Sequence, residues 1–418
     1  MIDVLDERLE ALYGLEAAEK QKERCRIAIE SALVRFAEKL DSGADELHIF
    51  RAPGRTEVCG NHTDHQHGQV LAAAIDRDIL AVVAVPAESS VPDGKTLIYS
   101  EGFGWIETDS PEKGTAGALV RGIVDGMSQS GYRTGGFCAY VTSDVPEGTG
   151  LSSSAAFEVL IGTIINELFN GGAAGASEIA RIAQAAENDY YGKPCGLMDQ
   201  TACATGGLCF MDFGDPSSPE VRKMDVDFAS LGYRICITNT HGSHAEYTDD
   251  YVAVQTDLAA AAGVFGKEVL EDVTLGEVIA HSGEIREAGG DRAFLRAMHV
   301  ASENARVAEE VSALQQKDMP EFLKLVRQSG NSSYKLLQNV HTDRTPGRQE
   351  LAVALAISEA VLGDAGACRV HGGGFAGTIQ AFVPEEMASE YIRAMDDAFG
   401  EGSCFVIRVC PEGGVQIL

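Results

Sequence analysis

Apolar and polar positions in the first forty residues repeat with the period of a helix. In "CRIAIESALVRFAEKL" the apolar side chains recur every three or four residues, which places them along one side of an α-helix. We therefore expect residues 1–46 to form a helical N-terminal extension that packs against the main body of the chain.

From about residue 47 the pattern becomes that of strands. Short apolar runs and strand-like alternation occur in "LHIFRAP", "VLAAAIDRDILAVVAVP", "KTLIYSE" and "GGFCAYVTSDVP", as expected for buried and half-buried strands. Helical spacing follows over 152–169 and 177–191, a strand-rich stretch covers 207–240, and 246–329 is mostly helical. The chain closes with a mixed segment that contains "CRVHGGGFAGTIQAFV" and "CFVIRVC".

The order of these elements indicates the fold class. Strands, then helices, then strands again predict an α+β fold rather than a strictly alternating parallel sheet. No repeat or low-complexity linker marks a domain boundary, so we place it in "FGDPSSPE". This gives an N-terminal domain at 47–215 and a C-terminal domain at 216–418.

Composition and charge narrow the range of partners. The 418 residues include 63 acidic and 33 basic side chains, so the formal net charge is −30. Such a chain repels nucleic acid and anionic membrane surfaces, and we expect neither as a partner. An anionic substrate would need a local positive site.

The cysteines and the first residues indicate the compartment. Ten cysteines are scattered without a CxxC pair, mostly in apolar runs such as "TACATGGLCFMDF", which favours buried reduced thiols over disulfides. The start "MIDVLDERLEALYG" has neither the basic beginning nor the apolar core of a signal peptide. We expect a cytoplasmic protein.

A glycine- and serine-rich loop, "VPEGTGLSSSAAFEVLIGTII", stands between a predicted strand and a predicted helix. Gly148 and Gly150 at such a turn expose backbone N–H groups beside the positive end of a helix dipole, which is a phosphate-binding arrangement. No lysine follows as in a Walker A loop, and Ser153 stands where the dinucleotide fingerprint has glycine. An ordinary glycine turn with a capping serine remains the alternative, although three serines are more than a cap requires.

A second unusual stretch is "GNHTDHQHGQVL", which holds three histidines and an aspartate within six residues. Imidazoles at His62, His65 and His67, with Asp64 between them, are ligands of the kind that zinc accepts. From the residues alone, a metal site and a loop with another purpose are both open.

Four segments resemble the GHMP kinases, a superfamily that includes galactokinase, homoserine kinase, mevalonate kinase and phosphomevalonate kinase. "PEGTGLSSSAA" is similar to the second motif of that superfamily, and "RVHGGGFAGTIQAFV" to its third. "RAPGRTEVCGNHTDHQHGQVL" resembles the galactokinase signature, whose usual form is APGRVNLIGEHTDYNGG, and "CGLMDQTA" resembles the GIMDQ segment of that family. The four occur in the family order between Arg51 and Val383, while 1–46 and much of 248–360 match no motif.

The resemblance implies a fold and a reaction. Its fold has two α+β domains with the active site between them: an N-terminal domain like the second domain of ribosomal protein S5, and a ferredoxin-like C-terminal domain. The galactokinase family transfers the γ-phosphoryl group of ATP to the C1 hydroxyl of galactose, which gives galactose 1-phosphate and ADP. Sugar, ATP and Mg²⁺ are then the implied ligands, and no protein partner is inferred.

The resemblance also assigns the catalytic and nucleotide-binding residues. Asp199 matches the base that takes the C1 hydroxyl proton, and Arg55 matches the residue beside it that stabilises charge on the transferring phosphoryl group. Ser154 and Glu187 match the Mg²⁺ ligands, and a cation would offset the cost of the Glu187 carboxylate near the end of its predicted helix. The nucleotide-binding residues are Gly148, Thr149, Gly150, Leu151, Ser152, Ser153 and Ser154.

For the sugar, the resemblance implies contacts from Asn61, His62, Asp64 and Tyr247. We therefore interpret the histidine-rich loop as a sugar clamp rather than a zinc site, with His65 and His67 as loop or surface groups. Asn61 replaces a family glutamate that usually accepts a hydrogen bond from the sugar's C6 hydroxyl. Asparagine keeps an acceptor, loses the charge and adds a donor.

These departures leave three hypotheses. The first is a galactokinase, the second is a GHMP kinase for a related sugar that differs at C6 or C2, and the third is a sugar- and ATP-binding regulator without catalysis. Two further departures are Ala376, which replaces a glycine after Phe375, and Ser333, in a segment where the family's usual histidine has no counterpart that we can place.

Overall fold

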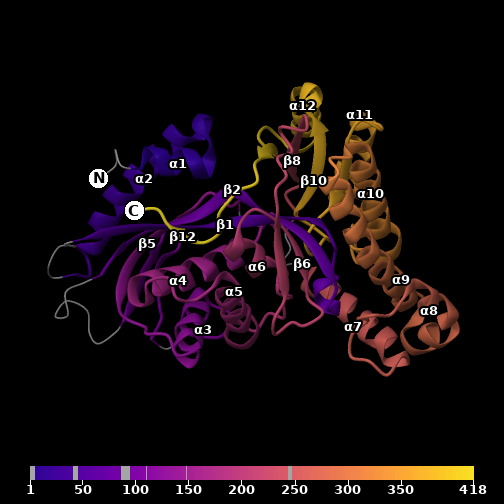
Figure 1. Cartoon of the computed structure of the whole chain (residues 1–418), viewed down its shortest axis with the longest axis horizontal. Helices are drawn as coiled ribbons and strands as arrows, with labels where there is room; N and C mark the ends of the chain where they lie inside the picture. The colour runs from indigo at the N-terminus through magenta and orange to yellow at the C-terminus, as the bar shows by residue number, and fades with distance from the viewer. Residues whose placement is uncertain (1–4, 41–45, 86–94, 110, 147, 243–246) are drawn as a thin grey trace.

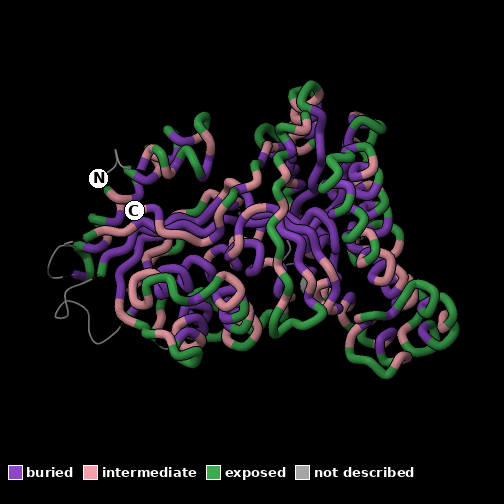
Figure 2. Tube along the Cα trace, in the orientation of Figure 1, coloured by how far each residue is buried: buried purple, intermediate pink, exposed green. Residues whose placement is uncertain are grey.

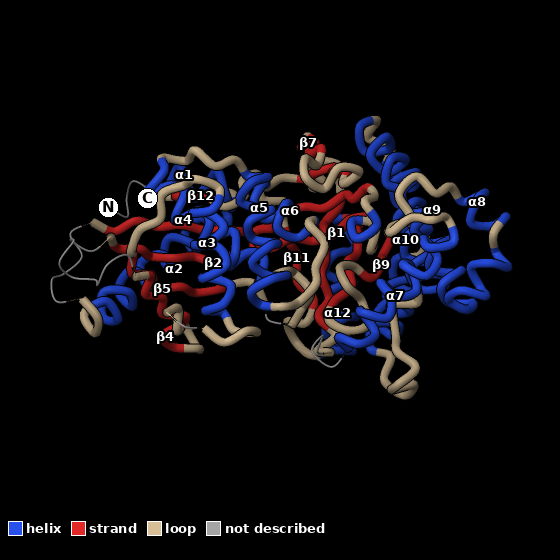
Figure 3. The backbone as a smooth tube through the Cα atoms, turned by 90° about the horizontal axis from the view of Figure 1, so that it is seen from below, coloured by secondary structure: helices blue, strands red, loops and turns tan. Residues whose placement is uncertain are grey.

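A computed structural model describes residues 5–40, 46–85, 95–109, 111–146, 148–242 and 247–418. Two sheets form its framework, with helices on their faces and a group of helices at the end opposite both termini (Figures 1 and 3). Residues 1–4 and 41–45 of the predicted extension lie outside the described residues.

The larger sheet has eight strands, and its longest members are β1 and β2. The strand order is β12-β1-β2-β5-β3-β4, and β6 and β7 extend from β2. Its strands are β1 (Leu47–Cys59), β2 (Gln69–Ala84), β3 (Thr96–Ser100), β4 (Gly104–Ile106), β5 (Phe137–Ser143), β6 (Leu208–Asp212), β7 (Glu220–Met224) and β12 (Val415–Gln416).

Both faces of this sheet are buried around β2, which has two apolar runs separated by Asp76, Arg77 and Asp78. Leu80 and Val82 pack on one side with α1 (Asp6–Tyr13) and α2 (Leu15–Phe36). Ala81 and Val83 alternate with them and join the core on the other side, because successive strand residues point to opposite faces. Figure 2 shows this buried layer between the two sets of helices. Burying each such Leu or Val stabilises the fold by about 1.5–3 kcal/mol.

Four helices pack on the face of the larger sheet opposite α1 and α2, and the loops between them contribute to the candidate site described below. They are α3 (Ala116–Gln129), α4 (Ser153–Asn170), α5 (Ala176–Ala185) and α6 (Met198–Thr205), with a π-helical turn at Ala186–Tyr191. The helices predicted at 152–169 and 177–191 are thus present, the second with a change of helix type near its end.

The smaller sheet is antiparallel, with the order β11-β8-β10-β9. Its strands are β8 (Tyr233–Asn239), β9 (Ala367–Val370), β10 (Thr378–Pro384) and β11 (Cys404–Ile407). Helices precede β9 and α12 (Ala388–Phe399) precedes β11, so the chain follows the βαββαβ order of a ferredoxin-like fold. Helix α11 (Glu350–Leu362) and α12 share a core with this sheet.

The remaining helices form a layer beside both sheets. They are α7 (Thr248–Val264), α8 (Leu275–Ala280), α9 (Ser282–Gln315) and α10 (Met319–Ser332). Among the helices of the described ranges, none is long and apolar enough to cross a membrane.

The sheets do not divide the chain at a single point. Strand β7 pairs with β6, through Leu208 opposite Met224, and β12 pairs with β1, through Phe50 opposite Gln416. Segments 220–224 and 415–416 therefore belong to the larger sheet. The division between 215 and 216 stays a proposal about domains.

Candidate active site

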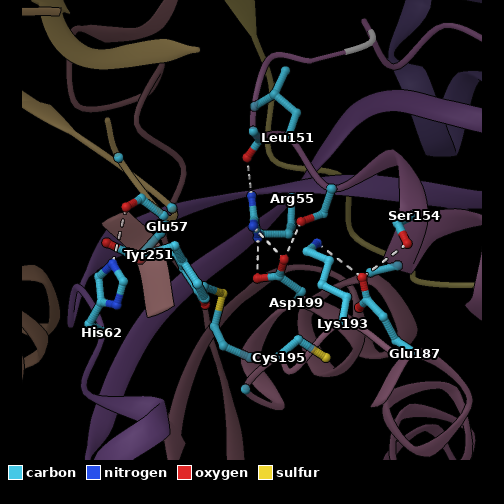
Figure 4. A pocket seen from close by; sticks show the side chains of 18 of the residues that line it. Arg55, Glu57, His62, Leu151, Ser154, Glu187, Lys193, Cys195, Asp199 and Tyr251 are labelled. Atoms are coloured by element: carbon cyan, nitrogen blue, oxygen red, sulfur yellow. Dashed lines mark hydrogen bonds and ion pairs between the residues drawn. The ribbon is translucent and has the colours of Figure 1, made fainter. Parts of the chain in front are cut away.

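One cavity, of about 280 Å³, collects residues from five separate segments of the chain. It lies where the loop before α4, strand β1, the segment before α6, the start of α7 and a glycine-rich turn after β9 meet (Figure 4). Its walls include Arg55, Glu57, His62, Asp64, His65, Gly148, Thr149, Gly150, Leu151, Ser152, Ser153, Ser154, Glu187, Lys193, Asp199, Tyr247, Tyr251, Gly372, Gly373, Gly374 and Phe375.

The glycine- and serine-rich loop forms one wall. Gly148 and Gly150 have φ of 69° and 72°, and Ser152 has φ of 61°, a conformation that costs a non-glycine residue energy and is often found at functional sites. Helix α4 begins at Ser153, and Ser152 does not cap it. Instead, the Ser152 hydroxyl donates a hydrogen bond to the Asp199 carboxylate. The alternative of a simple serine cap is therefore wrong for this residue.

Arg55 and Asp199 lie in direct contact. Nε of Arg55 donates to Oδ1 of Asp199 at 2.8 Å and Nη2 donates to Oδ2 at 2.6 Å, a bidentate pair of the stronger kind. Burial raises the pKa of Asp199, but the Arg55 guanidinium and the Ser152 hydroxyl outweigh burial, so the net pKa is lowered. Asp199 is thus an ionised carboxylate at neutral pH.

The local backbone explains why these two groups meet. Arg55 follows Gly54 on β1, and its N–H donates to the Leu151 carbonyl at 3.0 Å. A Cβ on Gly54 would stand 2.7 Å from that carbonyl oxygen, so glycine is needed for the loop to rest on the strand. Asp199 lies in the first turn of α6, where the helix dipole favours a carboxylate.

A cluster of oxygen atoms lies beside the loop. The Ser154 hydroxyl is 2.7 Å from Oε1 of Glu158 and 3.3 Å from Oε1 of Glu187. Gln200 donates to both carboxylates, at 3.0 and 2.9 Å, and Lys193 is 3.1 Å from Glu187. The predicted pair, Ser154 and Glu187, is thus brought together in an oxygen-rich site of the kind that Mg²⁺ prefers.

Three members of this cluster, Glu158, Gln200 and Lys193, were not predicted as site residues. Burial, and then the neighbouring Glu187, raise the pKa of Glu158 to about 8. Glu158 stands four residues after Ser154, within the apolar first half of helix α4, and this position was a signal that could have identified it. Lys193 reaches the cluster from the segment after the π-helical turn, which periodicity does not reveal. Together with Arg55 it supplies the positive charge that an anionic substrate needs.

His62, Asp64 and Tyr247, the predicted sugar contacts, also line the cavity. Figure 4 shows His62 on the side of the cavity away from Ser154 and Glu187, and this side is here called the sugar end. Burial lowers the pKa of His62 to about 3, so its imidazole is neutral and pairs with the Gly373 carbonyl at 3.1 Å. The Asp64 carboxylate lies against Gly196, where a Cβ would come within 1.8 Å of it. Gly196 thus leaves room for that side chain.

His65 differs from the prediction of a loop or surface group. Its side chain is only 14% exposed, it lines the cavity, and its Nε2 is 2.6 Å from the hydroxyl of Tyr251. Tyr251, four residues after Tyr247, was not predicted. His67 has a 36% exposed side chain and lies 3.7 Å from Glu271. Across the described ranges, no cluster of three or more histidine, cysteine or acidic side chains forms a metal site.

Asn61 is not placed on the cavity wall. It is fully buried, and its Nδ2 donates to the Gly372 carbonyl at 2.6 Å and to Glu57 at 3.1 and 3.2 Å. Its Oδ1 accepts from Asn339 at 2.8 Å and from Ser333 at 3.2 Å. Asn61 therefore ties the glycine-rich turn to β1, and Glu57 lines the cavity in this region.

Comparison with known proteins agrees with this geometry. Residues 118–207 match the model of the GHMP kinases N terminal domain, and residues 35–85 match that of the galactokinase galactose-binding signature. A galactokinase from Actinobacillus pleuropneumoniae serotype 3 is 33% identical over 352 residues, which are 83% of this chain and 88% of that protein.

Solved structures show the same fold. A galactokinase from Lactococcus lactis complexed with galactose superposes with a TM-score of 0.77 at 23% identity, covering 93% of this chain and 99% of that one. A mevalonate kinase from Methanococcus jannaschii superposes with a TM-score of 0.59 at 15% identity, covering 87% and 99%. The predicted two-domain α+β GHMP kinase fold is confirmed. With the matched signature and the curated relative, these observations show that the chain belongs to the galactokinase family of the GHMP kinases.

Proposed function

We propose that this chain is a galactokinase, which transfers the γ-phosphoryl group of ATP to the C1 hydroxyl of galactose. The observation that carries the proposal is the Arg55–Asp199 pair, which stands in one cavity between the loop at 148–154 and the side chains of His62 and Asp64. The curated relative at 33% identity supports the choice of galactose.

The proposed step joins the C1 oxygen to the γ-phosphorus and breaks the bond from that phosphorus to the β,γ-bridging oxygen, which leaves with ADP. Asp199, ionised at neutral pH, accepts the proton of the C1 hydroxyl or orients that hydroxyl. Arg55 keeps its charge and stabilises negative charge on the transferring group. The protein thus contributes mainly position and electrostatics.

Residues 148–154 would bind the phosphates of the nucleotide through backbone N–H groups and hydroxyls. Ser154 and Glu187 would hold Mg²⁺, which neutralises phosphate charge when bound, and the nearby oxygens of Glu158 fit this donor set. Lys193 adds a cation beside them. His62, Asp64 and Tyr247 would contact the sugar.

A second candidate is a kinase of this family for another monosaccharide. It is favoured by the burial of Asn61 beneath the cavity wall, which leaves Glu57, His65 and Tyr251 at the sugar end. A non-catalytic regulator has less support, because Arg55 and Asp199 are both present and paired.

The cytoplasm is the proposed site of action. All ten cysteines are free and nine of them are buried, as expected for a protein of a reducing compartment.

A coupled assay of ADP release tests the proposal. Galactose, N-acetylgalactosamine, L-arabinose, glucose and mannose are compared at saturating ATP, and galactose is expected to give the highest kcat/KM. Faster saturable turnover of another sugar would establish the second candidate instead. Binding of sugar and ATP without any product would indicate the regulator.

A further inference from the structure

Glu57 and Asn61 form a contact at the sugar end of the cavity. Both are buried, at 1% and 0% exposure, but only Glu57 lines the cavity. Glu57 belongs to the stretch of β1 between two shifts in pairing with β2, at Pro53/Arg55 and at Glu57/Cys59. Arg55 and Glu57, two residues apart in this stretch, share one face of the strand. Figure 4 shows both side chains beside the cavity.

The hydrogen bonds of Glu57 leave one oxygen under-used. Oε1 accepts from Nη2 of Arg369 at 2.7 Å and from Nδ2 of Asn61 at 3.1 Å. Among the residues that the structure describes, Oε2 accepts only from Asn61, at 3.2 Å. A carboxylate oxygen can accept two hydrogen bonds, so Oε2 has capacity for a ligand.

The two residues are exchanged relative to the usual signature. That signature, APGRVNLIGEHTDYNGG, has asparagine at the position of Glu57 and glutamate at the position of Asn61. Because the two side chains touch, the exchange keeps one carboxylate and one amide in contact. The exchange places the carboxylate at position 57, on the cavity wall, whereas position 61 is buried away from the wall in this structure.

We propose that Glu57 is a specificity-determining residue whose Oε2 hydrogen-bonds a hydroxyl group of the sugar. This inference rests on the proposed function, because it places the reacting C1 hydroxyl beside Arg55 and Asp199. Glu57 lies roughly 7 Å farther along the strand, so it meets the sugar on the side of the ring away from C1. The class of substrate is a pyranose with a free hydroxyl there.

A hydroxyl matches this oxygen better than other groups do. Burial raises the pKa of Glu57 to about 7, while the Arg369 guanidinium and the Asn61 amide oppose the rise. Both protonation states therefore occur near neutral pH, and a hydroxyl can donate to the ionised oxygen or accept from the protonated one. A sugar carboxylate could pair with only one of these states.

A cycle of enzyme and substrate variants tests the proposal. Wild type and Glu57→Gln are compared on galactose and on its 2-, 3-, 4- and 6-deoxy analogues, with KM and kcat from ADP release and Kd from calorimetry. For one analogue, wild type should lose between about 5-fold and 150-fold in Kd. E57Q replaces the carboxyl group with a neutral amide that forms a weaker hydrogen bond, so it should bind galactose more weakly than wild type and discriminate less against that analogue, with kcat changed less than KM.

The double variant Glu57→Asn with Asn61→Glu retains one carboxylate and one amide beside Arg369. Only the position of the carboxylate changes. This variant should change which deoxy analogue is penalised. His67→Asn is the matched control, because His67 lies on the same loop outside the cavity wall and asparagine tolerates its φ of 55°. Its sugar affinities should be those of wild type.

The outcomes separate the two claims. In one outcome galactose is turned over, but the free-energy losses from E57Q and from each deoxy substitution simply add for all four analogues. This result overturns the role of Glu57 and leaves the proposed function standing. If another sugar is the better substrate, the cycle is run with its deoxy analogues. Failure of every sugar to bind overturns both. If the variants do not fold, a crystal structure of the wild-type protein with its sugar decides: a hydroxyl at hydrogen-bonding distance from Oε2 supports the role, and none there refutes it.

Discussion

Three donors fix the carboxylate of Asp199: two nitrogens of Arg55 and the hydroxyl of Ser152. The resemblance of "GLMDQ" to the family's GIMDQ segment singled out this residue, which the structure places in the first turn of the short helix α6. The pattern could not show the Ser152 contact. That contact depends on a left-handed turn at Ser152, which the three serines in sequence do not distinguish.

Asp199→Asn should abolish turnover while ATP still binds. The amide keeps the size of the side chain but loses the basic oxygen, so kcat should fall by a factor of about 10² to 10⁴. ADP release measures kcat, and calorimetric titration with ATP measures binding. A variant with near-normal kcat would show that Asp199 is not the base.

Asn61 shows where a motif misleads at the residue scale. Its sequence position matches a sugar-contacting glutamate, but its amide is used by Gly372, Glu57 and Asn339. Two of those partners, Asn339 and Gly372, come from segments 278 and 311 residues away along the chain. No local pattern contains that information. Lys193 is only six residues from Glu187 in sequence, but the π-helical turn that precedes Lys193 has no periodic signature.

Among the elements, hydrophobic period was the most informative feature. The spacing in the first forty residues predicts α1 and α2, and the short apolar runs within 70–84 predict a strand, which the structure buries on both faces. The π-helical turns at Ala186–Tyr191 and Ser333–Leu337 were not predicted. Their extra residue per turn depends on contacts between neighbouring elements and leaves no periodic trace.

Strand β1 and the loop before α4 meet at Gly54, so Gly54→Ala should separate them. The new Cβ would stand 2.7 Å from the Leu151 carbonyl oxygen, and relieving that overlap should cost about 1–3 kcal/mol of unfolding free energy. The KM for ATP should rise as well, since the loop is displaced. Urea denaturation and ADP release measure the two effects.

Gly263→Ala in α7 is the control for this substitution. A Cβ there meets nothing within 4 Å, so stability should be unchanged or rise, because alanine favours a helix more than glycine does. Equal destabilisation by both substitutions would contradict the close approach at Gly54.

Helix α1 is held on the larger sheet by a buried polar network. The Tyr13 hydroxyl donates to Asp78, which also accepts from Arg51 at 2.7 Å and from Arg24 at 2.6 Å. Tyr13→Phe should lower the free energy of unfolding by about 1.5–3 kcal/mol, since it removes a buried hydrogen bond to a charged group. Tyr132→Phe removes a hydroxyl bonded to Glu178 near the surface and should cost less. A smaller loss at Tyr13 than at Tyr132 would argue against this anchor.

For the whole molecule, buried acids set part of the dependence of stability on pH. Glu310 is fully buried in α9, and burial raises its pKa to about 8 from 4.5. Between these values the folded chain holds a proton that the unfolded chain has released, so this group's contribution to stability falls as pH rises from about 4.5 to 8.

Glu310→Gln should therefore reduce the loss of Tm between pH 6 and pH 8.5, measured by thermal unfolding. Glutamine keeps the shape without the ionisation. The exposed neighbour Glu309 provides the control, because Glu309→Gln should leave the difference in Tm between the two pH values unchanged. An unaltered difference in E310Q would show that Glu310 does not carry this part of the pH dependence.

The contact between positions 57 and 61 also limits how the chain can change over evolutionary time. A single substitution from either arrangement gives two carboxylates or two amides next to the fully buried Arg369. In the two-amide intermediate Arg369 loses the carboxylate that it contacts directly, whereas the two-carboxylate intermediate keeps it and can share a proton. Mutational paths that exchange the carboxylate and the amide between positions 57 and 61 are therefore expected to pass through the two-carboxylate intermediate. The effect of a substitution at either position depends on the residue at the other.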